Sequence, residues 1–448
     1  MKRNLIMSLV AIGLLTSANA TDDLSSMFKD GNISGQIRAF YIDRQFEGTK
    51  TLHRNATSLG GNLKFETADY KGLSFGTAFY TTNEVASSPD KDPSLFGKNS
   101  EGYSILGEAY LQYKYNNTTF KGGRQKLDTP LAGSDDARTL PSLFEAYVLT
   151  NKDIPNTTLL LAQVTKFAQG SFGRAYYAAT YAPASAVLSA TSGYTYQINV
   201  DKTGDFLNMG SYAVGKDTDG VTVASATYAP TKSIKAQVWD YYAYDILNAV
   251  YGEVNVGWNC LLTDKIKPSL SGQIIKENAV GSRYAGDVNS LFAAGKFNVA
   301  VGDASAYIAY SEQSKDDSGS APTGLVALNK ATITPWGGMP AYTQGMVTRH
   351  QFMAGTKATK VAVSYDFKNL GANVLASAYY ASFDMDKNSG YGIARTATEP
   401  GFDIAYKPAA VKNLELKLRG NFPRNFAEST AGKPLGWDEY RVIANYNF

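Results

Sequence analysis

Charged side chains of both signs crowd one connecting segment of the chain, which reads GRQKLDTPLAGSDDARTLPSLFEAY from Gly123 to Tyr147. Its ionisable residues are Arg124, Lys126, Asp128, Asp135, Asp136, Arg138 and Glu145. Opposed charges in a narrow water-filled passage create a field that sorts solutes by charge and dipole, because low-dielectric walls strengthen it. The alternative is a solvated surface loop with ordinary charges. We predict that this segment constricts such a passage.

Other chemistry for these residues has weaker sequence signals. A hydrolase needs a nucleophile near a base, and the two histidines, His53 and His350, lie in no recognisable catalytic motif. Asp135 and Asp136 are adjacent and lack the spaced ligand set of a calcium loop. The single cysteine, Cys260, excludes an internal disulfide and a multi-cysteine metal site, and we expect a small packed side chain there. We predict no catalytic residues, no cofactor and no metal.

The end of the chain indicates which element could surround a passage. One face of the closing RVIANYNF is apolar and aromatic, with Val442, Ala444, Tyr446 and Phe448. The other face is mostly polar, with Arg441, Ile443, Asn445 and Asn447. Such a strand suits a closed barrel with lipid outside and water inside. The alternative is an edge strand of a soluble sheet. The ending with Tyr446 and Phe448 also resembles the signal by which the barrel-assembly machinery recognises bacterial outer-membrane barrels.

Segments with similar alternation recur along the chain, and connections of two lengths separate them. NISGQIRAFYI and SLGGNLKFET place their charges on one face. ADYKG, NNT, KNLG and KPAAVKN read as short turns, whereas the stretches 83–102, 315–342, 384–398 and 423–437 read as loops. Short turns facing the periplasm and longer loops facing outward are typical of outer-membrane barrels. Counting from either terminus places the long connections on the same side, which supports one barrel rather than two linked domains.

The beginning of the chain predicts export. Lys2 and Arg3 precede an apolar run, and Ala18, Asn19 and Ala20 supply a signal-peptidase site, so we expect a signal peptide over 1–20 and a single domain over 21–448. The remaining chain carries 41 of the 43 basic residues against 40 acidic ones. This balance gives no reason to expect a nucleic-acid partner. Many aromatic residues (30 Tyr, 21 Phe) at a mean hydropathy of −0.24 favour a barrel over a helical membrane protein.

The length of the chain sets the size of the barrel. Roughly 428 residues at about 22 to 24 per strand, connections included, give on the order of 18 strands. A direct count of strand-like segments ranges from 16 to about 22. A barrel of about 16 to 18 strands encloses water, and only a short segment precedes the first strand, so there is no room for a plug domain. We therefore predict an all-β, transmembrane antiparallel barrel of about 18 strands.

The final strands also predict a row of basic residues inside the barrel. Leu414, Leu416 and Leu418 belong to one face, which places Lys417 and Arg419 on the other. The same parity turns Arg441 and, across the closing seam, Arg38 inward. We hypothesise that this basic track, comprising Arg38, Lys417, Arg419 and Arg441, guides anionic groups past the constricting segment. The alternative is that these charges only hydrate the lumen and pair with acids such as Glu415.

A family resemblance covers essentially the whole mature chain. GRQKLDTPLAGSDDARTLPSLFEAY, NATSLGGNLKFET, SFGTAFYTTN and the terminal strand together resemble the OprD-type outer-membrane porins, particularly their epsilonproteobacterial branch. The resemblance implies 18 antiparallel strands, trimers, a third extracellular loop folded into the pore and a ladder of basic residues on the wall. Some members of that family prefer carboxylate-bearing solutes and basic amino acids, and others pass small solutes generally.

These observations predict a passive channel in the bacterial outer membrane. Its partners would be small hydrophilic solutes and ions, outer-membrane lipid and lipopolysaccharide, the barrel-assembly machinery and two further copies in a homotrimer. Two alternatives stay open: a surface adhesin or structural barrel, suggested by the long stretch 315–342, and an outer-membrane hydrolase. We also expect Trp336 and Trp437 in the outer interface belt, because tryptophan favours membrane interfaces.

Overall fold

Alternation of apolar and polar side chains produces long antiparallel strands along most of the chain. The computed structural model describes residues 23–47, 52–171, 203–315, 329–333, 335–338, 340–387, 394–428 and 434–448. On β1 (Asn32–Phe46), Ile33 and Ile37 are exposed, whereas Arg38 and Phe40 on the opposite row are buried. The two rows face different surroundings, as the sequence pattern predicts. The expected signal peptide, 1–20, lies outside the described residues.

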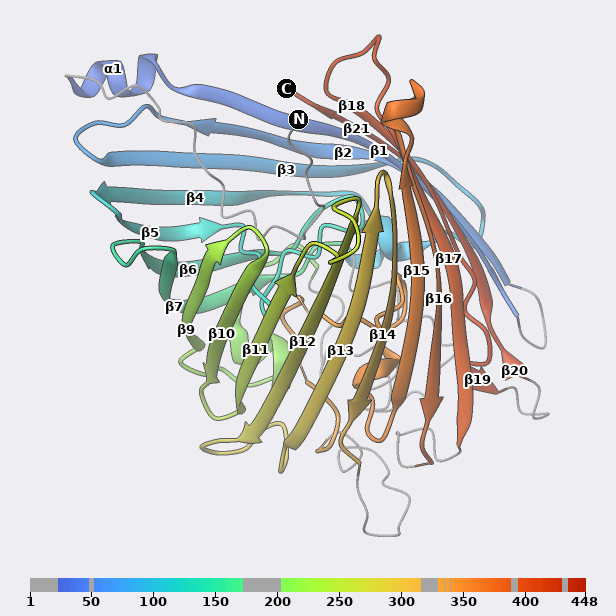
Figure 1. The fold of residues 1–448 in the computed structure, drawn as a ribbon. Helices are drawn as coiled ribbons and strands as arrows, with labels where there is room; N and C mark the ends of the chain where they lie inside the picture. The colour runs from blue at the N-terminus through green and yellow to red at the C-terminus, as the bar shows by residue number, and fades with distance from the viewer. Residues whose placement is uncertain are drawn as a thin grey trace.

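In the described residues, 18 strands form a closed antiparallel barrel (Figure 1). They are β1 (Asn32–Phe46), β2 (Leu52–Glu66), β3 (Leu73–Ser87), β4 (Tyr103–Tyr115), β5 (Thr118–Gln125), β6 (Leu143–Asn151), β7 (Thr157–Ala168), β9 (Val221–Thr231), β10 (Ile234–Ala243), β11 (Leu247–Gly257), β12 (Ile266–Ala279), β13 (Asn289–Val301), β14 (Ala304–Gln313), β15 (Lys357–Asp366), β16 (Val374–Met385), β17 (Arg395–Tyr406), β18 (Leu414–Asn421) and β21 (Trp437–Asn447). The predicted fold class is confirmed.

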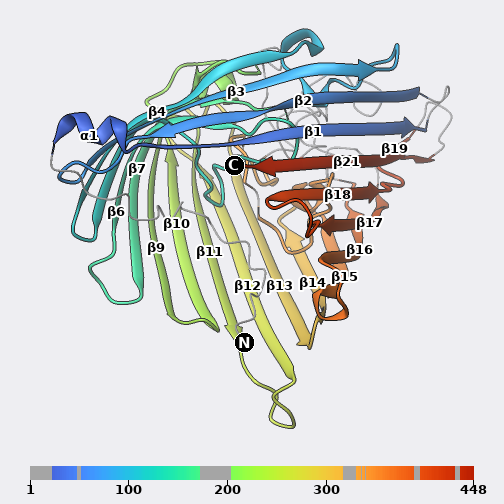
Figure 2. The ribbon, with the colours of Figure 1, turned by 90° about the horizontal axis from the view of Figure 1, so that it is seen from above.

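A single seam closes the barrel. Along the rest of the wall, each strand pairs with the barrel strands next to it in sequence, whereas β1 also pairs with β21 at the seam, with Arg38 opposite Asn445 (Figure 2). The seam extends to the last residue, because Gly35 and Phe448 exchange two backbone hydrogen bonds at 3.0 and 3.1 Å. Closure leaves no unpaired strand edge for lipid to meet.

The other elements are short. They are the helices α1 (Leu24–Lys29) and α3 (Met209–Val214), the 3₁₀ turns Pro93–Leu95, Lys98–Ser100, His350–Phe352 and Phe367–Leu370, and the strands β8 (Leu207–Asn208), β19 (Ala427–Glu428) and β20 (Pro434–Leu435). Strand β8 pairs antiparallel with the end of β7, and β19 pairs with β20. Among the described residues, no helix is long and apolar enough to cross a bilayer.

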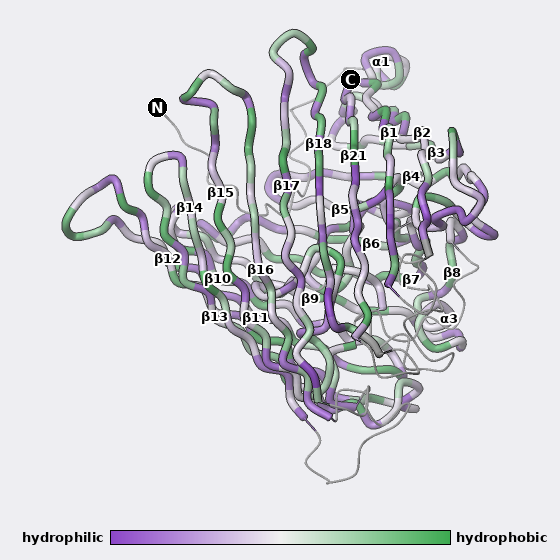
Figure 3. Tube along the Cα trace, turned by 90° about the vertical axis from the view of Figure 1, so that its right-hand side faces the viewer, coloured by the Kyte–Doolittle hydropathy of each residue, from purple (hydrophilic) through white to green (hydrophobic). Residues whose placement is uncertain are grey.

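The two rims of the barrel differ. β1 begins and β21 ends at the rim that carries turns such as 116–117, 232–233 and 302–303. The opposite rim carries the longer segments 88–102, 126–142 and 314–356, although the connection 244–246 there is also short. Hydrophobic and hydrophilic positions alternate along the strands in Figure 3. The short-turn rim is the one expected to face the periplasm.

Candidate functional site

The inner face of β1, β18 and β21 carries the four residues of the predicted basic track. Arg441 is 1 % exposed, whereas its neighbour Val442 is 50 % exposed on the outer face. On β18, Lys417 and Arg419 alternate with the exposed Leu416 and Leu418. Arg419 pairs in register with Arg441. The strand parity therefore places all four predicted track residues, Arg38 included, on the face opposite the exposed apolar side chains.

A buried carboxylate organises the arginines of this wall. Glu439 of β21 lies 2.8 Å from Arg44 Nε, 3.1 Å from Arg138 Nη2 and 3.1 Å from Arg441 Nε. All four side chains are at least 95 % buried. Arg44 also forms a 2.9 Å ion pair with Asp92 of the β3–β4 connection. Glu439 therefore joins the barrel wall to two connecting segments, and removing it would leave buried cations with too little opposite charge.

The charged connecting segment 126–142 lies against this wall. Asp136 Oδ1 is 2.5 Å from Arg38 Nη1, and Asp136 Oδ2 is 3.5 Å from Lys126 Nζ. Arg38 also donates to the backbone oxygen of Arg138 at 2.6 Å. Burial opposes ionisation of Asp136, but the two cations outweigh it and hold the pKa of this carboxyl below its usual value. The segment thus presents an ionised carboxylate beside the basic wall.

The remaining acids of the segment shape its backbone. Asp128 accepts hydrogen bonds from the backbone and hydroxyl of Ser134. Asp135 has a left-handed backbone with φ 43° and accepts a hydrogen bond from Gly338 N at 3.1 Å, which links two connections far apart in sequence. Across the described residues, no group of three or more His, Cys, Asp and Glu side chains is placed to hold a metal ion.

Arg124 and Glu145 lie outside the connecting segment, contrary to the sequence assignment. They are register partners on β5 and β6 and approach to 3.8 Å. Glu145 also pairs with Lys166 at 3.0 Å, and it alternates with the inward-facing Phe144 and Ala146. Strand parity assigns Glu145 to the face of Tyr147, which is 54 % exposed. Both residues therefore belong to the barrel wall and not to the segment 126–142.

Each accessible member of the basic track has an acidic neighbour. Lys417 Nζ is 2.9 Å from Glu415, and Arg419 Nη2 is 2.8 Å from Asp403 of β17. Lys64 of β2, absent from the predicted track, lies 3.4 Å from Glu66 and 3.2 Å from Glu108. At these positions the inner wall therefore presents pairs of opposite charge rather than an unbroken row of positive charge.

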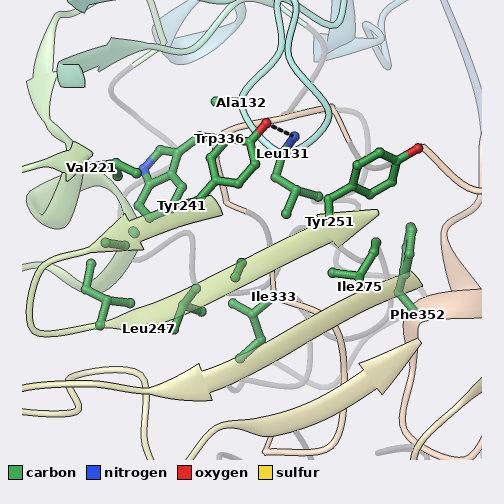
Figure 4. Close-up of a cluster of buried hydrophobic side chains, with 14 of the residues drawn as sticks. Leu131, Ala132, Val221, Tyr241, Leu247, Tyr251, Ile275, Ile333, Trp336 and Phe352 are labelled. Atoms are coloured by element: carbon green, nitrogen blue, oxygen red, sulfur yellow. Dashed lines mark hydrogen bonds between the residues drawn. The ribbon is translucent and has the colours of Figure 1, made fainter. Parts of the chain in front are cut away.

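Part of the wall across the lumen, here called the apolar wall, carries buried apolar side chains. Inner side chains of β9 to β13 pack there on connecting segments, among them 126–142 and the β14–β15 connection, in the cluster of Figure 4, which labels Leu131, Ala132, Val221, Tyr241, Leu247, Tyr251, Ile275, Ile333, Trp336 and Phe352. Leu131 N donates to Tyr241 Oη at 3.3 Å. The segment 126–142 therefore contacts the apolar wall through Leu131 and the charged wall through Asp136. The interface-belt prediction is wrong for Trp336, which is buried and donates to Met209 O.

Sequence reasoning missed a second connecting segment that contacts the inner face of the barrel, within the β14–β15 connection. Glu399 of β17 accepts hydrogen bonds from the backbone of Met346 and Val347 at 2.7 and 3.1 Å. Glu253 of β11 accepts from Tyr342 Oη at 3.0 Å. The alternation of side chains along their strands places both carboxylates on the inner face, so the sequence could have identified them. Their partners lie in the β14–β15 connection, and side-chain alternation does not predict the path of a connection.

Both histidines contact neighbouring side chains of the barrel or its connections. His53 Nε2 lies 2.6 Å from Asp43 on the neighbouring strand, and half of its side chain is exposed. His350 packs edge-on against Phe426 with ring centroids 4.2 Å apart. Burial, together with the charge of Arg395, lowers the pKa of His350 to about 3. His350 is therefore neutral at ordinary pH and packs as an aromatic side chain.

A closed barrel of 18 strands with an apolar outer face and a charged inner face has the architecture of an outer-membrane channel. The family model for the outer membrane porins of the OprD family matches residues 26–448. The chain belongs to this family, which places it in the bacterial outer membrane.

Solved structures with the same fold come from pseudomonads. OccK9 (OpdG) of Pseudomonas aeruginosa is 19 % identical with a TM-score of 0.74, and the match covers 94 % of this chain and 99 % of that one. A BenF-like porin from Pseudomonas fluorescens Pf-5 is 16 % identical with the same TM-score and coverage. OpdK of P. aeruginosa, solved with vanillate, is 14 % identical with a TM-score of 0.70 and again the same coverage. No curated protein sequence matches the chain.

Proposed function

We propose that this porin is a passive diffusion channel for small hydrophilic solutes and ions that favours carboxylate-bearing solutes, amino acids among them. The observation that carries the proposal is the pairing of accessible charges on the inner wall. Lys64, Lys417 and Arg419 each lie beside a carboxylate, at 2.8 to 3.4 Å. A solute with both a carboxylate and an ammonium group can exchange its ion pairs with these residues at little net cost, because each departing partner is replaced.

The connecting segments supply the proposed size limit. Residues 126–142 contact the charged wall at Arg38 and the apolar wall at Tyr241, which supports their role as the constricting third loop. The second segment, held by Glu253 and Glu399, supports a further narrowing. In this proposal solutes pass between the fixed charges of Asp136, Lys126 and the track, and no chemical step occurs.

Four further assignments belong to the same proposal. The chain starts with a cleaved signal peptide over 1–20, and Tyr446 and Phe448 are recognised by the barrel-assembly machinery. The strings that resemble OprD-type porins support its assignment to the epsilonproteobacterial branch. The porin assembles as a trimer in the outer membrane.

Bilayer electrophysiology tests the proposal directly. The purified, refolded protein is expected to give discrete conductance steps, with a reversal potential under a KCl gradient that reports the net effect of track and segment charges. Liposome swelling should be faster with glycine or gluconate than with an uncharged sugar of similar size. Equal swelling rates would reject the carboxylate preference, and a folded barrel without conductance would reject the channel.

A further inference from the structure

The turn between β11 and β12 exposes more apolar surface than the other turns of the short-turn rim, of which the most exposed apolar residue is Leu370 at 68 %. Leu261 and Leu262 at its tip are 101 % and 93 % exposed, and Trp258 at its base is 44 % exposed. It protrudes as the yellow-green hairpin at the lower edge of Figure 2. Exposed leucines at a tip remain unfavourable in water, because their apolar surface is unburied. We therefore expect an apolar surface to cover this hairpin, which comprises residues 258–265.

The hairpin is continuous with the lipid-facing wall. The β11–β12 ladder reaches Gly257 opposite Ser269, and backbone hydrogen bonds of 3.0 Å from Trp258 to Pro268 and from Cys260 to Ile266 extend it. Trp258 continues the outward row of Val254 and Val256, which are 46 % and 39 % exposed. A single apolar strip thus runs from the barrel wall onto the hairpin without a polar break.

Lysines flank the hairpin. Lys265 and Lys267 are exposed at its second strand. Lys232 is exposed in the neighbouring β9–β10 turn, which Gly257 N joins through a 2.7 Å hydrogen bond to Ser233 O. Asp264 is the one acid within the hairpin. Apolar side chains at a tip with lysines at its base match the boundary between acyl chains and phosphate groups, where lysine stems lie along apolar surface and their ammonium groups reach the headgroups.

Lysines recur around most of the short-turn rim. Exposed lysines occur in or beside five other short turns, at Lys71, Lys114, Lys152, Lys368, Lys407 and Lys412. The same turns also hold acids, of which Asp69 accepts from Gly72 N and Asp366 from Lys368 N. A protein partner would contact one side of the barrel, whereas a lipid leaflet contacts its full circumference. The distribution of lysine around the rim therefore favours lipid.

From these observations we propose that the short-turn rim binds anionic phospholipid of the inner leaflet, with the tip of the hairpin 258–265 inserted among the acyl chains and Lys232, Lys265 and Lys267 on the phosphates. This binding depends on the outer-membrane location alone and is independent of the solute preference. It would fix the depth and tilt of the barrel on one side.

The native cysteine allows a direct test. An environment-sensitive fluorophore on Cys260 is placed in the full-length barrel, reconstituted in phosphatidylcholine vesicles with a minor fraction of brominated phosphatidylglycerol or brominated phosphatidylcholine. We expect blue-shifted emission, quenching by the bromolipids and stronger quenching by the phosphatidylglycerol form. Quenching by aqueous iodide with none by bromolipid would place the hairpin in water and overturn the proposal.

Two variants separate the apolar and ionic parts. The double variant Leu261→Ser, Leu262→Ser should lose bromolipid quenching while its single-channel conductance is unchanged. Replacing Lys232, Lys265 and Lys267 by Gln should lower the preference for phosphatidylglycerol by on the order of 100-fold, because about 1 kcal/mol per lysine at an anionic surface sums to about 3 kcal/mol. The matched variant Lys71→Gln, Lys152→Gln removes rim lysines distant in sequence from the hairpin and should leave this local preference unchanged.

A second readout avoids the label. Trp258 is quenched by the same bromolipids if the hairpin is inserted, so Trp258→Phe should remove a bromolipid-sensitive part of the tryptophan emission of the unlabelled protein. An unchanged quenching profile in Trp258→Phe would contradict insertion even if the fluorophore on Cys260 were quenched.

Discussion

The two walls of the lumen hold the segment 126–142 in different ways. On the β1 and β21 side, Asp136 and Arg138 form ion pairs with Arg38 and Glu439. On the β10 side, Leu131 is buried against apolar side chains. Buried ion pairs depend on protonation and on each partner being present, whereas apolar contacts depend on fit and buried area. The same segment should therefore respond to charge changes at one end and to volume changes at the other.

The comparison also separates charged residues that stabilise the structure from charged residues that can set selectivity. Arg138, Arg441 and Glu439 are almost wholly buried, so they cannot contact a solute without rearrangement. Lys417, Arg419 and Asp136 keep about a fifth to a third of their side chains exposed. We infer that the buried charges position the segment and that the exposed charges meet the solute.

The largest effect is expected at the charged wall. Glu439→Gln removes the carboxylate shared by Arg44, Arg138 and Arg441, and should lower the free energy of unfolding by about 3–5 kcal/mol because buried cations lose their partner. Urea unfolding in vesicles measures it. The control Glu415→Gln, whose partner Lys417 is accessible, should cost no more than about 1 kcal/mol. Equal losses in the two variants would remove the distinction between buried and exposed pairs.

A smaller loss is expected at the apolar wall. Leu131→Ala should lower the free energy of unfolding by about 2–3 kcal/mol, because it leaves a cavity beside Tyr241. The reversal potential should stay at the wild-type value, since no charge changes. A shift in reversal potential would show that the apolar contact positions the selective charges, which would weaken the contrast between the walls.

The accessible carboxylate of the segment should govern selectivity. Asp136→Asn removes one negative charge beside Arg38 and Lys126, so the reversal potential should move toward anions, with a stability loss of about 1.5 kcal/mol. The pKa of Asp136 is lowered from 3.8, so its stabilising contribution is complete above that pH and is lost as the pH falls through the lowered value. The wild type should approach the selectivity of the variant only below pH 3.8. A shift already at neutral pH would identify another titrating group.

The smallest effect is expected from the track. Lys417→Gln should change the free energy of unfolding by less than about 1 kcal/mol, because its pair with Glu415 is accessible to water. Its reversal potential should move slightly toward cations, and the swelling rate with gluconate should fall. Lys412→Gln, at the rim rather than on the inner face, is the matched control. If both variants behave alike, Lys417 has no specific role in solute passage.

Alternation of side chains predicted the barrel and the inward faces of β1, β18 and β21, because the bilayer imposes one solvent on each face. The strand count was less certain because strands such as β3 run on into the connections. In addition, β8 adds only a two-residue pairing to the barrel sheet, and β19 and β20 pair with each other outside it. Trp336 was misplaced because its buried neighbours come from a loop interior, where interface preferences do not apply.

The partners of the charged residues could not be predicted. Strand alternation shows that Glu439 and Arg441 share a face. The other members of this cluster, Arg44, Asp92 and Arg138, come from other parts of the chain. Arg124 and Glu145 were grouped with the segment because they flank it in sequence, although both lie on paired strands. Sequence gives the face of a residue, whereas loop paths decide which charges meet.

The seam between β1 and β21 also bears on how the barrel is made. The other contacts between barrel strands join neighbours along the chain, whereas the seam joins residues as far apart as Gln36 and Asn447, separated by 411 positions. Sequential hairpins can form early, but this closure requires the last residues to be present and carries the largest loop entropy. An incomplete chain therefore keeps two open edges, and truncation by one strand should abolish the sealed wall instead of yielding a smaller pore. The barrel can therefore close only when its last strand is present.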